Sequence, residues 1–120
     1  MIESDVVATV LLSASKQGWR LFRNNVGVLM DSRGVPVRYG LANTSKQVNK
    51  ALKSGDLIGI RPVVITPDMV GKVVGQFISR ECKRPGWKFN PNDERDVAQR
   101  NWAELINSLG GDAKVTTGDL

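Results

Sequence analysis

The sequence predicts an α/β fold, in which helices pack around a mixed β-sheet as a sandwich. Two long segments, 2–17 and 90–109, carry apolar residues at helical spacing, and Gly, Asn and Pro separate the short apolar runs between them. With 120 residues and an ordinary share of apolar and charged side chains, the chain is long enough to bury one hydrophobic core. We therefore expect a single domain over residues 1–120.

The first helix is expected over residues 2–17, and Gly18 ends its pattern. Its apolar stripe consists of Ile2, Val6, Val7, Val10, Leu11 and Ala14. Glu3 falls at the centre of this stripe, so its carboxylate is expected to point inward. The alternative is that the first helical turn is solvated and that Glu3 only complements the helix dipole.

The first strands are expected at 19–24, 28–30 and 35–39, with a tight turn at 31–34 between the last two. Residues 43–53 are predicted to form either a short helix capped by Asn43 or Thr44, or a mobile basic loop.

The second half of the chain is expected to supply strands at 56–60 and 72–83, with 63–65 continuing the first of them beyond Pro62. The last helix is predicted to begin with Asn90 as its N-cap and Pro91 as its first residue, and to end near Leu109. An edge strand at 113–117 completes the sheet. The buried stripe of the last helix consists of Ala98, Trp102, Leu105, Ile106 and Leu109, with Gln99 at its edge.

The charge of the chain indicates an anionic partner. The formal net charge is +5 and the isoelectric point is 9.7, which is typical of small domains that bind nucleic acid. Lys46, Lys50 and Lys53 recur at i, i+4 and i+7 and predict a cationic ridge directly before Asp56. Four arginines are further candidates for phosphate contacts, namely Arg20, Arg23, Arg33 and Arg38. Each of these cations is alternatively a solvated surface charge.

Missing residue types exclude several kinds of chemistry. The chain has no histidine, which excludes Ser-His and Cys-His catalysis and zinc sites with mixed Cys and His ligands. The single cysteine, Cys82, cannot form an internal disulfide and fits a reducing compartment. No apolar run approaches the roughly 18 residues of a membrane span, and the N-terminus lacks the basic region of a signal peptide. We therefore expect a cytoplasmic protein without a membrane partner.

Three polar residues stand out on the strands of the second half. Asp56 opens one strand, and Glu81 and Lys83 end the next, where alternation places both on the same face as Phe77 and Ser79. Charged groups on a half-buried face are usually paired or bind a metal. Two carboxylates and an ammonium could hold a divalent cation and position a water. The alternative is a Glu–Lys ion pair at a strand end and an aspartate in a turn.

The order of these residues resembles the VRR-NUC family, the virus-type replication-repair nucleases of the PD-(D/E)xK superfamily. The resemblance is carried by Glu3 on the first helix, Gly55-Asp56-Leu57 at a strand start, Glu81-Cys82-Lys83 at a strand end and Gln99 on the following helix. It covers residues 3 to about 115. The chain departs from the family in having Gly55 where Pro often precedes the aspartate, and in a longer hairpin between Ile65 and Lys72.

The resemblance implies a restriction-endonuclease-like three-layer sandwich, a central mixed sheet flanked by helices. It implies that Asp56, Glu81 and the main-chain carbonyl of Cys82 bind Mg²⁺ or Mn²⁺, supported by Glu3. Lys83 would activate or orient the attacking water, and the sequence leaves these two roles open. Gln99 would hold the catalytic group or the DNA.

The implied activity is hydrolysis of DNA phosphodiester bonds. Standalone members of the family resemble homodimeric Holliday-junction resolvases, so the expected partner is branched DNA and no small-molecule substrate, with a phage or mobile element as the source. The alternatives are a flap or nicking endonuclease acting on other DNA structures, and a non-catalytic basic DNA-binding module.

Overall fold

The computed structural model describes residues 2–120, which form two compact units. Unit 1 ends at Gly59, and unit 2 is Ile60–Leu120. Over the described residues the chain has three α-helices and three two-stranded sheets, two in the first half of the chain and one in unit 2. The predicted mixed α/β class is confirmed. The strand pairings of the described residues are β1 with β4, β2 with β3 and β5 with β6, and these pairings alone do not make the single central sheet that was expected.

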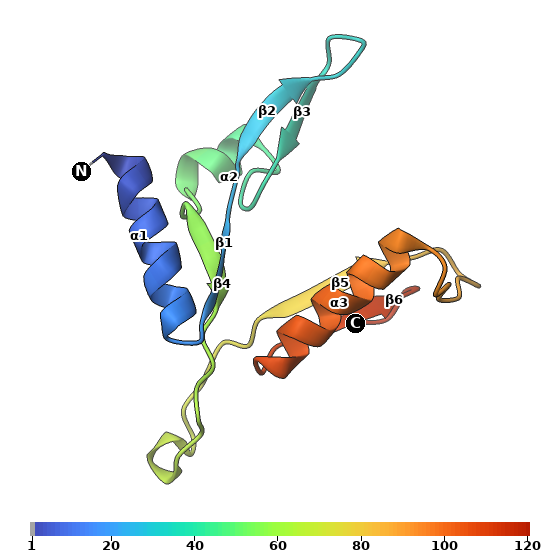
Figure 1. Cartoon of the computed structure of the whole chain (residues 1–120). Helices are drawn as coiled ribbons and strands as arrows, with labels where there is room; N and C mark the ends of the chain where they lie inside the picture. The colour runs from blue at the N-terminus through green and yellow to red at the C-terminus, as the bar shows by residue number, and fades with distance from the viewer. Residues whose placement is uncertain (1) are drawn as a thin grey trace. The chain divides into compact units, whose positions relative to one another are not determined.

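Unit 1 begins with helix α1, Glu3–Lys16, as the apolar periodicity predicts. The helix ends where the Trp19 N–H donates to the Ala14 carbonyl at 2.9 Å, with Gly18 at a φ of 80°. Ala14 is the buried residue of the stripe, and α1 packs against strand β1, Arg20–Arg23. Figure 1 shows α1 running beside β1 and β4. The amphipathic pattern therefore does place this helix on a sheet.

Strand β4, Leu57–Ile60, pairs with β1. The Asn24 N–H donates to the Asp56 carbonyl at 2.8 Å at one end of the pair, and Gly59 lies against Arg20 at the other. A Cβ atom at Gly59 would collide with the Arg20 carbonyl oxygen, so a larger residue there would force the two strands apart. Asp56 is thereby held at the start of a strand, as the sequence predicts.

A β-hairpin is formed by strands β2, Gly27–Met30, and β3, Pro36–Tyr39. Its turn is the predicted one: the Gly34 N–H donates to the Asp31 carbonyl at 3.0 Å, and Gly34 has a φ of 78°. The Asp31 carboxylate accepts the Arg33 and Val35 N–H groups at 2.8 and 2.9 Å and pairs with the Arg33 guanidinium at 3.1 Å. Arg33 thus stabilises its own turn.

Unit 2 consists of strand β5, Ile78–Cys82, helix α3, Glu94–Ser108, and strand β6, Asp112–Thr116. The two strands are parallel and neighbouring, with Ile78 opposite Asp112 and Cys82 opposite Thr116. Helix α3 connects them and packs against β6, and Figure 1 shows it lying alongside both strands. Ile106 is fully buried, and the rings of Phe77 and Trp102 meet edge to face with centroids 6.5 Å apart.

Several predicted boundaries are wrong. Segment 63–65 is not a strand, and the strand predicted from Lys72 begins only at Ile78. The intervening chain is irregular apart from a 3₁₀ turn, η1, at Pro67–Met69. Val64, Ile65 and Val73 are more than four-fifths exposed, which shows that apolar alternation alone does not make a strand when no neighbouring strand pairs with it.

Two predicted helix caps are also wrong. Helix α2 is Lys46–Ala51, and Ser45 rather than Asn43 or Thr44 caps it, accepting the Val48 N–H at 3.1 Å. Helix α3 is capped by Asp93 instead of Asn90, since the Asp93 carboxylate accepts the Asp96 N–H at 3.0 Å. The reason is that the Asp96 carboxylate turns back to accept the Asn90 N–H at 3.0 Å, which fixes 90–93 as a loop.

None of the helices within residues 2–120 is both long enough and apolar enough to cross a membrane.

Candidate active site

In unit 2, two predicted catalytic residues lie on the same side of the chain: Glu81 on β5 and Lys83 directly after the strand ends. The Glu81 carboxylate and the Lys83 ammonium are 3.7 Å apart, and the Lys83 side chain is only 16% exposed. The ammonium also lies 5.5 Å from the centroid of the Trp87 ring. Lys83 is therefore held between a carboxylate and an aromatic face, so its position is fixed by contacts on two sides.

Helix α3 brings Gln99 to the same face. Glu81, Gln99 and Trp102 line an open hollow of about 380 Å³, and the Trp102 indole N–H donates to the Ser79 hydroxyl at 2.9 Å, which fixes helix and strand together. The side-chain oxygen of Gln99, Oε1, is buried and accepts no hydrogen bond from the described residues. A buried acceptor without a partner is costly, and such groups in native proteins commonly mark a place where a ligand or water binds. The sequence predicts Gln99 at the edge of the buried stripe of the helix, and in the structure Gln99 lines the hollow beside Glu81.

On the opposite face of β5, Arg80 links the two strands of unit 2. Arg80 forms an ion pair with Asp112 at 2.7 Å and donates to the Asp112 carbonyl at 2.8 Å, which ties β5 to β6. The hydrogen bond from Arg80 holds the pKa of the Asp112 carboxyl below its ordinary value. Cys82 is exposed, so its thiol is not part of the core.

In unit 1, Glu3 and Asp56 line a second hollow. This hollow has a volume of about 320 Å³ and is also lined by Asn24 and Arg23. Glu3 is exposed rather than buried, and it lines this hollow together with Val7 of the same apolar stripe. Among the described residues, neither carboxylate forms a hydrogen bond or an ion pair.

Asn24 positions the segment that carries Asp56, a role that sequence reasoning missed. Its side-chain amide donates to the Ser54 hydroxyl at 2.8 Å and to the Gly55 carbonyl at 2.9 Å. Its main-chain N–H binds the Asp56 carbonyl, so one residue fixes three consecutive positions. Asn24 followed by Asn25 reads as a simple turn signal, and a partner 30 residues away cannot be recognised from a single sequence.

A second asparagine, Asn43, anchors the base of the hairpin. It is 2% exposed and donates to the Gly27 and Tyr39 carbonyls at 2.8 Å each. Arg38 in turn donates to the Asn43 main-chain and side-chain oxygens at 3.0 and 2.8 Å. The Arg38 guanidinium is therefore engaged in the structure of unit 1, which leaves fewer of its donors for a phosphate.

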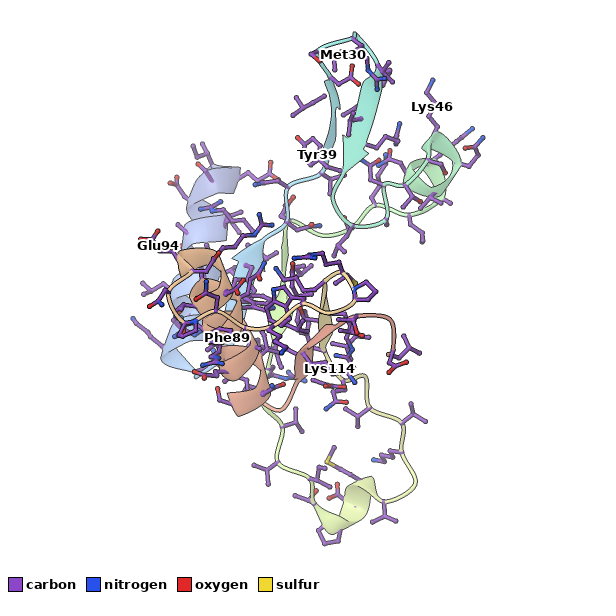
Figure 2. All side chains as sticks on the ribbon, turned by 90° about the vertical axis from the view of Figure 1, so that its right-hand side faces the viewer. Met30, Tyr39, Lys46, Phe89, Glu94 and Lys114 are labelled. Atoms are coloured by element: carbon purple, nitrogen blue, oxygen red, sulfur yellow. The ribbon has the colours of Figure 1, made fainter. Side chains whose placement is uncertain are left out.

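The other predicted phosphate contacts are exposed. Arg20 and Arg23 lie on β1, and Arg23 borders the hollow that contains Asp56. Lys46 and Lys50 are on α2, and Figure 2 shows the Lys46 side chain extending away from the helix. Lys53 lies beyond the end of α2 and donates to the Asn49 side chain, so the three lysines do not form one helical ridge.

The donor chemistry fits a hard divalent cation. Carboxylate and main-chain carbonyl oxygens are the ligands that Mg²⁺ and Mn²⁺ prefer, and the unpaired oxygen of Gln99 adds a polar acceptor beside Glu81. Within either unit, no three or more Asp, Glu or Cys side chains of the described residues gather at one point. Each unit instead presents a few oxygen donors next to basic groups.

Comparisons with protein-family models, with curated proteins and with solved structures give no match to this chain.

Proposed function

We propose that the protein is a metal-dependent, structure-selective DNA endonuclease that acts as a homodimeric Holliday-junction resolvase. The observation that carries the proposal is Glu81, which shares a hollow with the unpartnered Gln99 oxygen and pairs with the Lys83 ammonium. An acid and an unsatisfied buried acceptor share one hollow, and the ammonium of Lys83 is paired with that acid, which is more than a structural ion pair requires. The ordered resemblance to the VRR-NUC nucleases supports the same conclusion.

In this proposal Asp56, Glu81 and the Cys82 carbonyl hold Mg²⁺ or Mn²⁺, with Glu3 in support. When bound, the cation supplies positive charge to the phosphate and makes a bound water more acidic. The Lys83 ammonium, restrained by Glu81 and Trp87, orients water or a phosphate oxygen. The Gln99 oxygen accepts a hydrogen bond from a group that enters the hollow.

The proposed substrate is DNA because the charge of the chain favours it. Carboxylates beside a phosphate would repel it, and the net charge of +5 offsets that repulsion over the surface. Arg20, Arg23, Arg38, Lys46, Lys50 and Lys53 are the proposed phosphate contacts. A single site cuts one strand, so symmetric cuts across a junction require two copies.

The proposal includes a restriction-endonuclease-like three-layer sandwich, in which helices flank a central mixed sheet. The proposed place of action is the cytoplasm, which is that of the host if a phage encodes the protein.

The test compares a labelled four-way junction, a 5′ flap, a nicked duplex and plain duplex DNA, with Mg²⁺, Mn²⁺ or a chelator. Asp56→Asn and Lys83→Ala are the active-site variants, and the exposed Asp68→Asn and Lys72→Ala are their matched controls. We expect paired, metal-dependent cuts confined to the junction, lost in the first two variants and kept in the controls. The expected loss is at least 100-fold, roughly the contribution of one positioned catalytic group.

Two other results would refute different parts of the proposal. Equal cutting of the flap or duplex would retain the nuclease and refute the resolvase. Binding of DNA without cutting in either metal would refute both and leave the basic DNA-binding module.

A further inference from the structure

The outer edge of strand β2 is unpaired in unit 1. The hairpin pairs Gly27 with Tyr39, Val28 with Arg38, Leu29 with Val37 and Met30 with Pro36. Over the described residues β2 has no other strand neighbour, and the main-chain groups on its outer side have no partner. Unpaired strand edges are the surfaces on which proteins add a further strand.

The hydrogen bonding at the turn determines which residues of β2 direct their main-chain N–H and C=O groups toward the open edge. The Asp31 N–H donates to the Val35 carbonyl at 2.9 Å, so this pair is hydrogen-bonded across the hairpin. Because bonded and non-bonded pairs alternate in an antiparallel ladder, Leu29 bonds inward to Val37, whereas the N–H and C=O groups of Val28 and Met30 point outward. Pro36 sits opposite Met30, where an N–H is not needed inside the hairpin, which agrees with this assignment.

The two edges of the hairpin differ. On β3 the outward positions are Pro36, which has no N–H, and Arg38. A proline at an edge blocks strand addition. On β2 both outward residues keep their donor and acceptor, so the edge of β2 is open and that of β3 is protected.

Four side chains of the hairpin are apolar and largely uncovered. Leu29 and Met30 are 65% and 67% exposed, and Val28 and Val37 are about half exposed. Figure 2 shows Met30 near the tip of the hairpin and Tyr39 toward its base. Two-stranded hairpins are marginally stable alone in water, so this one gains stability from a further strand on its open edge.

We infer that two copies of the chain associate by pairing their β2 strands across a twofold axis at Leu29. A twofold axis makes the paired strands antiparallel and places Leu29 opposite its own copy. Val28 then lies opposite Met30 of the second copy, and both have their main-chain groups directed at the new partner. The register thus satisfies about four new main-chain hydrogen bonds and joins the two hairpins into one four-stranded sheet.

This register suits a second copy in particular. An axis through Val28 would place Gly27, which carries no side chain, opposite Leu29 of the second copy, and an axis through Met30 would place Asp31, whose carboxylate is bound in the turn, opposite Leu29. With the axis at Leu29, apolar side chains meet on both faces: Leu29 meets Leu29, and Val28 meets Met30. The hairpin is small, so the contact lies below about 1,200 Å² in total and the dissociation constant is expected in the micromolar range.

The inference rests on the proposed function for its purpose, since paired cuts need two copies, but its test uses neither DNA nor metal. A failed association with intact cleavage would refute the interface alone. Association without cleavage would refute the nuclease alone.

The first experiment places charges on the axis. Leu29→Lys puts two ammonium groups opposite each other, while Val37→Lys adds the same charge to its cross-strand neighbour on the same face. In analytical ultracentrifugation at 5–100 µM, roughly the range of the expected dissociation constant, Leu29→Lys should weaken self-association at least about tenfold. Val37→Lys should weaken it much less. Mixing Leu29→Lys with Leu29→Glu should restore a dimer that contains one copy of each.

The second experiment traps the pair covalently. In a Cys82→Ser background, Leu29→Cys should form a disulfide between copies on addition of diamide, because directly opposed non-bonded residues have Cα atoms about 4.5 Å apart. Val37→Cys is the control and should remain monomeric on a non-reducing gel. A wild-type chain that is monomeric at 100 µM, or a Leu29→Lys variant that associates like the wild type, would overturn the inference. Crosslinking of Val37→Cys as fast as Leu29→Cys would overturn the register.

Discussion

Replacing Gln99 by methionine should stabilise the protein and abolish cleavage. The Gln99 oxygen is buried in the hollow beside Glu81 and receives no hydrogen bond from the described residues. Methionine has nearly the same length and places no polar atom at that point. The free energy of unfolding should therefore rise, although a residue of the proposed active site has been lost.

The magnitude follows from the cost of an unsatisfied buried group, about 1–3 kcal/mol. The hollow opens to solvent and the Gln99 side chain as a whole is only half-buried, so the low end applies. We expect a gain of about 1 kcal/mol, which for a chain of this size raises Tm by roughly 3–6 °C.

Urea and thermal unfolding, both followed by tryptophan fluorescence, measure this gain in the metal-free protein. Trp87 and Trp102 lie in the same unit as Gln99 and report on its unfolding. The matched control is Gln47→Met, in which an exposed glutamine of α2 is replaced and stability should change by less than about 0.5 kcal/mol. A Gln99→Met variant that is destabilised by about 1 kcal/mol or more would show that the oxygen has a partner in solution and would refute the reasoning.

Three further predictions concern the framework of the site. Asn24→Ala removes two side-chain hydrogen bonds to the loop before β4 and should cost about 1–3 kcal/mol in urea unfolding, whereas the exposed neighbour Asn25→Ala should cost little. Ile106→Ala opens a cavity at a fully buried position and should lower the free energy of unfolding by about 2–5 kcal/mol. Arg80 holds the pKa of Asp112 below its ordinary value of 3.8, so the carboxylate stabilises the fold above that pH and loses this effect as the pH falls through the lower folded-state pKa. The Tm difference between wild type and Asp112→Asn should therefore be present at neutral pH and disappear in acid; a difference that persists below the folded-state pKa would contradict the assignment.

Elements with strong local signals were predictable from the sequence. The apolar stripe of α1, the Asp31–Gly34 turn and the start of β4 after Asp56 all depend on neighbouring residues. The common face of Glu81 and Lys83 followed from strand alternation, and their 3.7 Å separation confirms that they share it. In an extended chain the backbone conformation alone determines which side chains share a face.

Predictions failed where local and distant interactions compete. Residues 72–77 alternate like a strand but have no partner strand, and Asn90 has the composition of a cap but gives its main-chain N–H to Asp96. In both cases the local pattern allowed more than one conformation. The presence or absence of a partner elsewhere in the chain decided which one formed.

The amino-acid sequence thus accounts for which residues are chemically able to form a nuclease site and on which elements they lie. Only the tertiary structure shows that Asn24 holds the Asp56 segment, that β5 and β6 pair in parallel around α3, and that the Gln99 oxygen is buried without a partner. These features join residues up to 34 positions apart, as in the opposition of Ile78 and Asp112. The physical reason is that period and propensity act over a few residues, whereas burial and hydrogen-bond satisfaction depend on which distant segments the folded chain brings together.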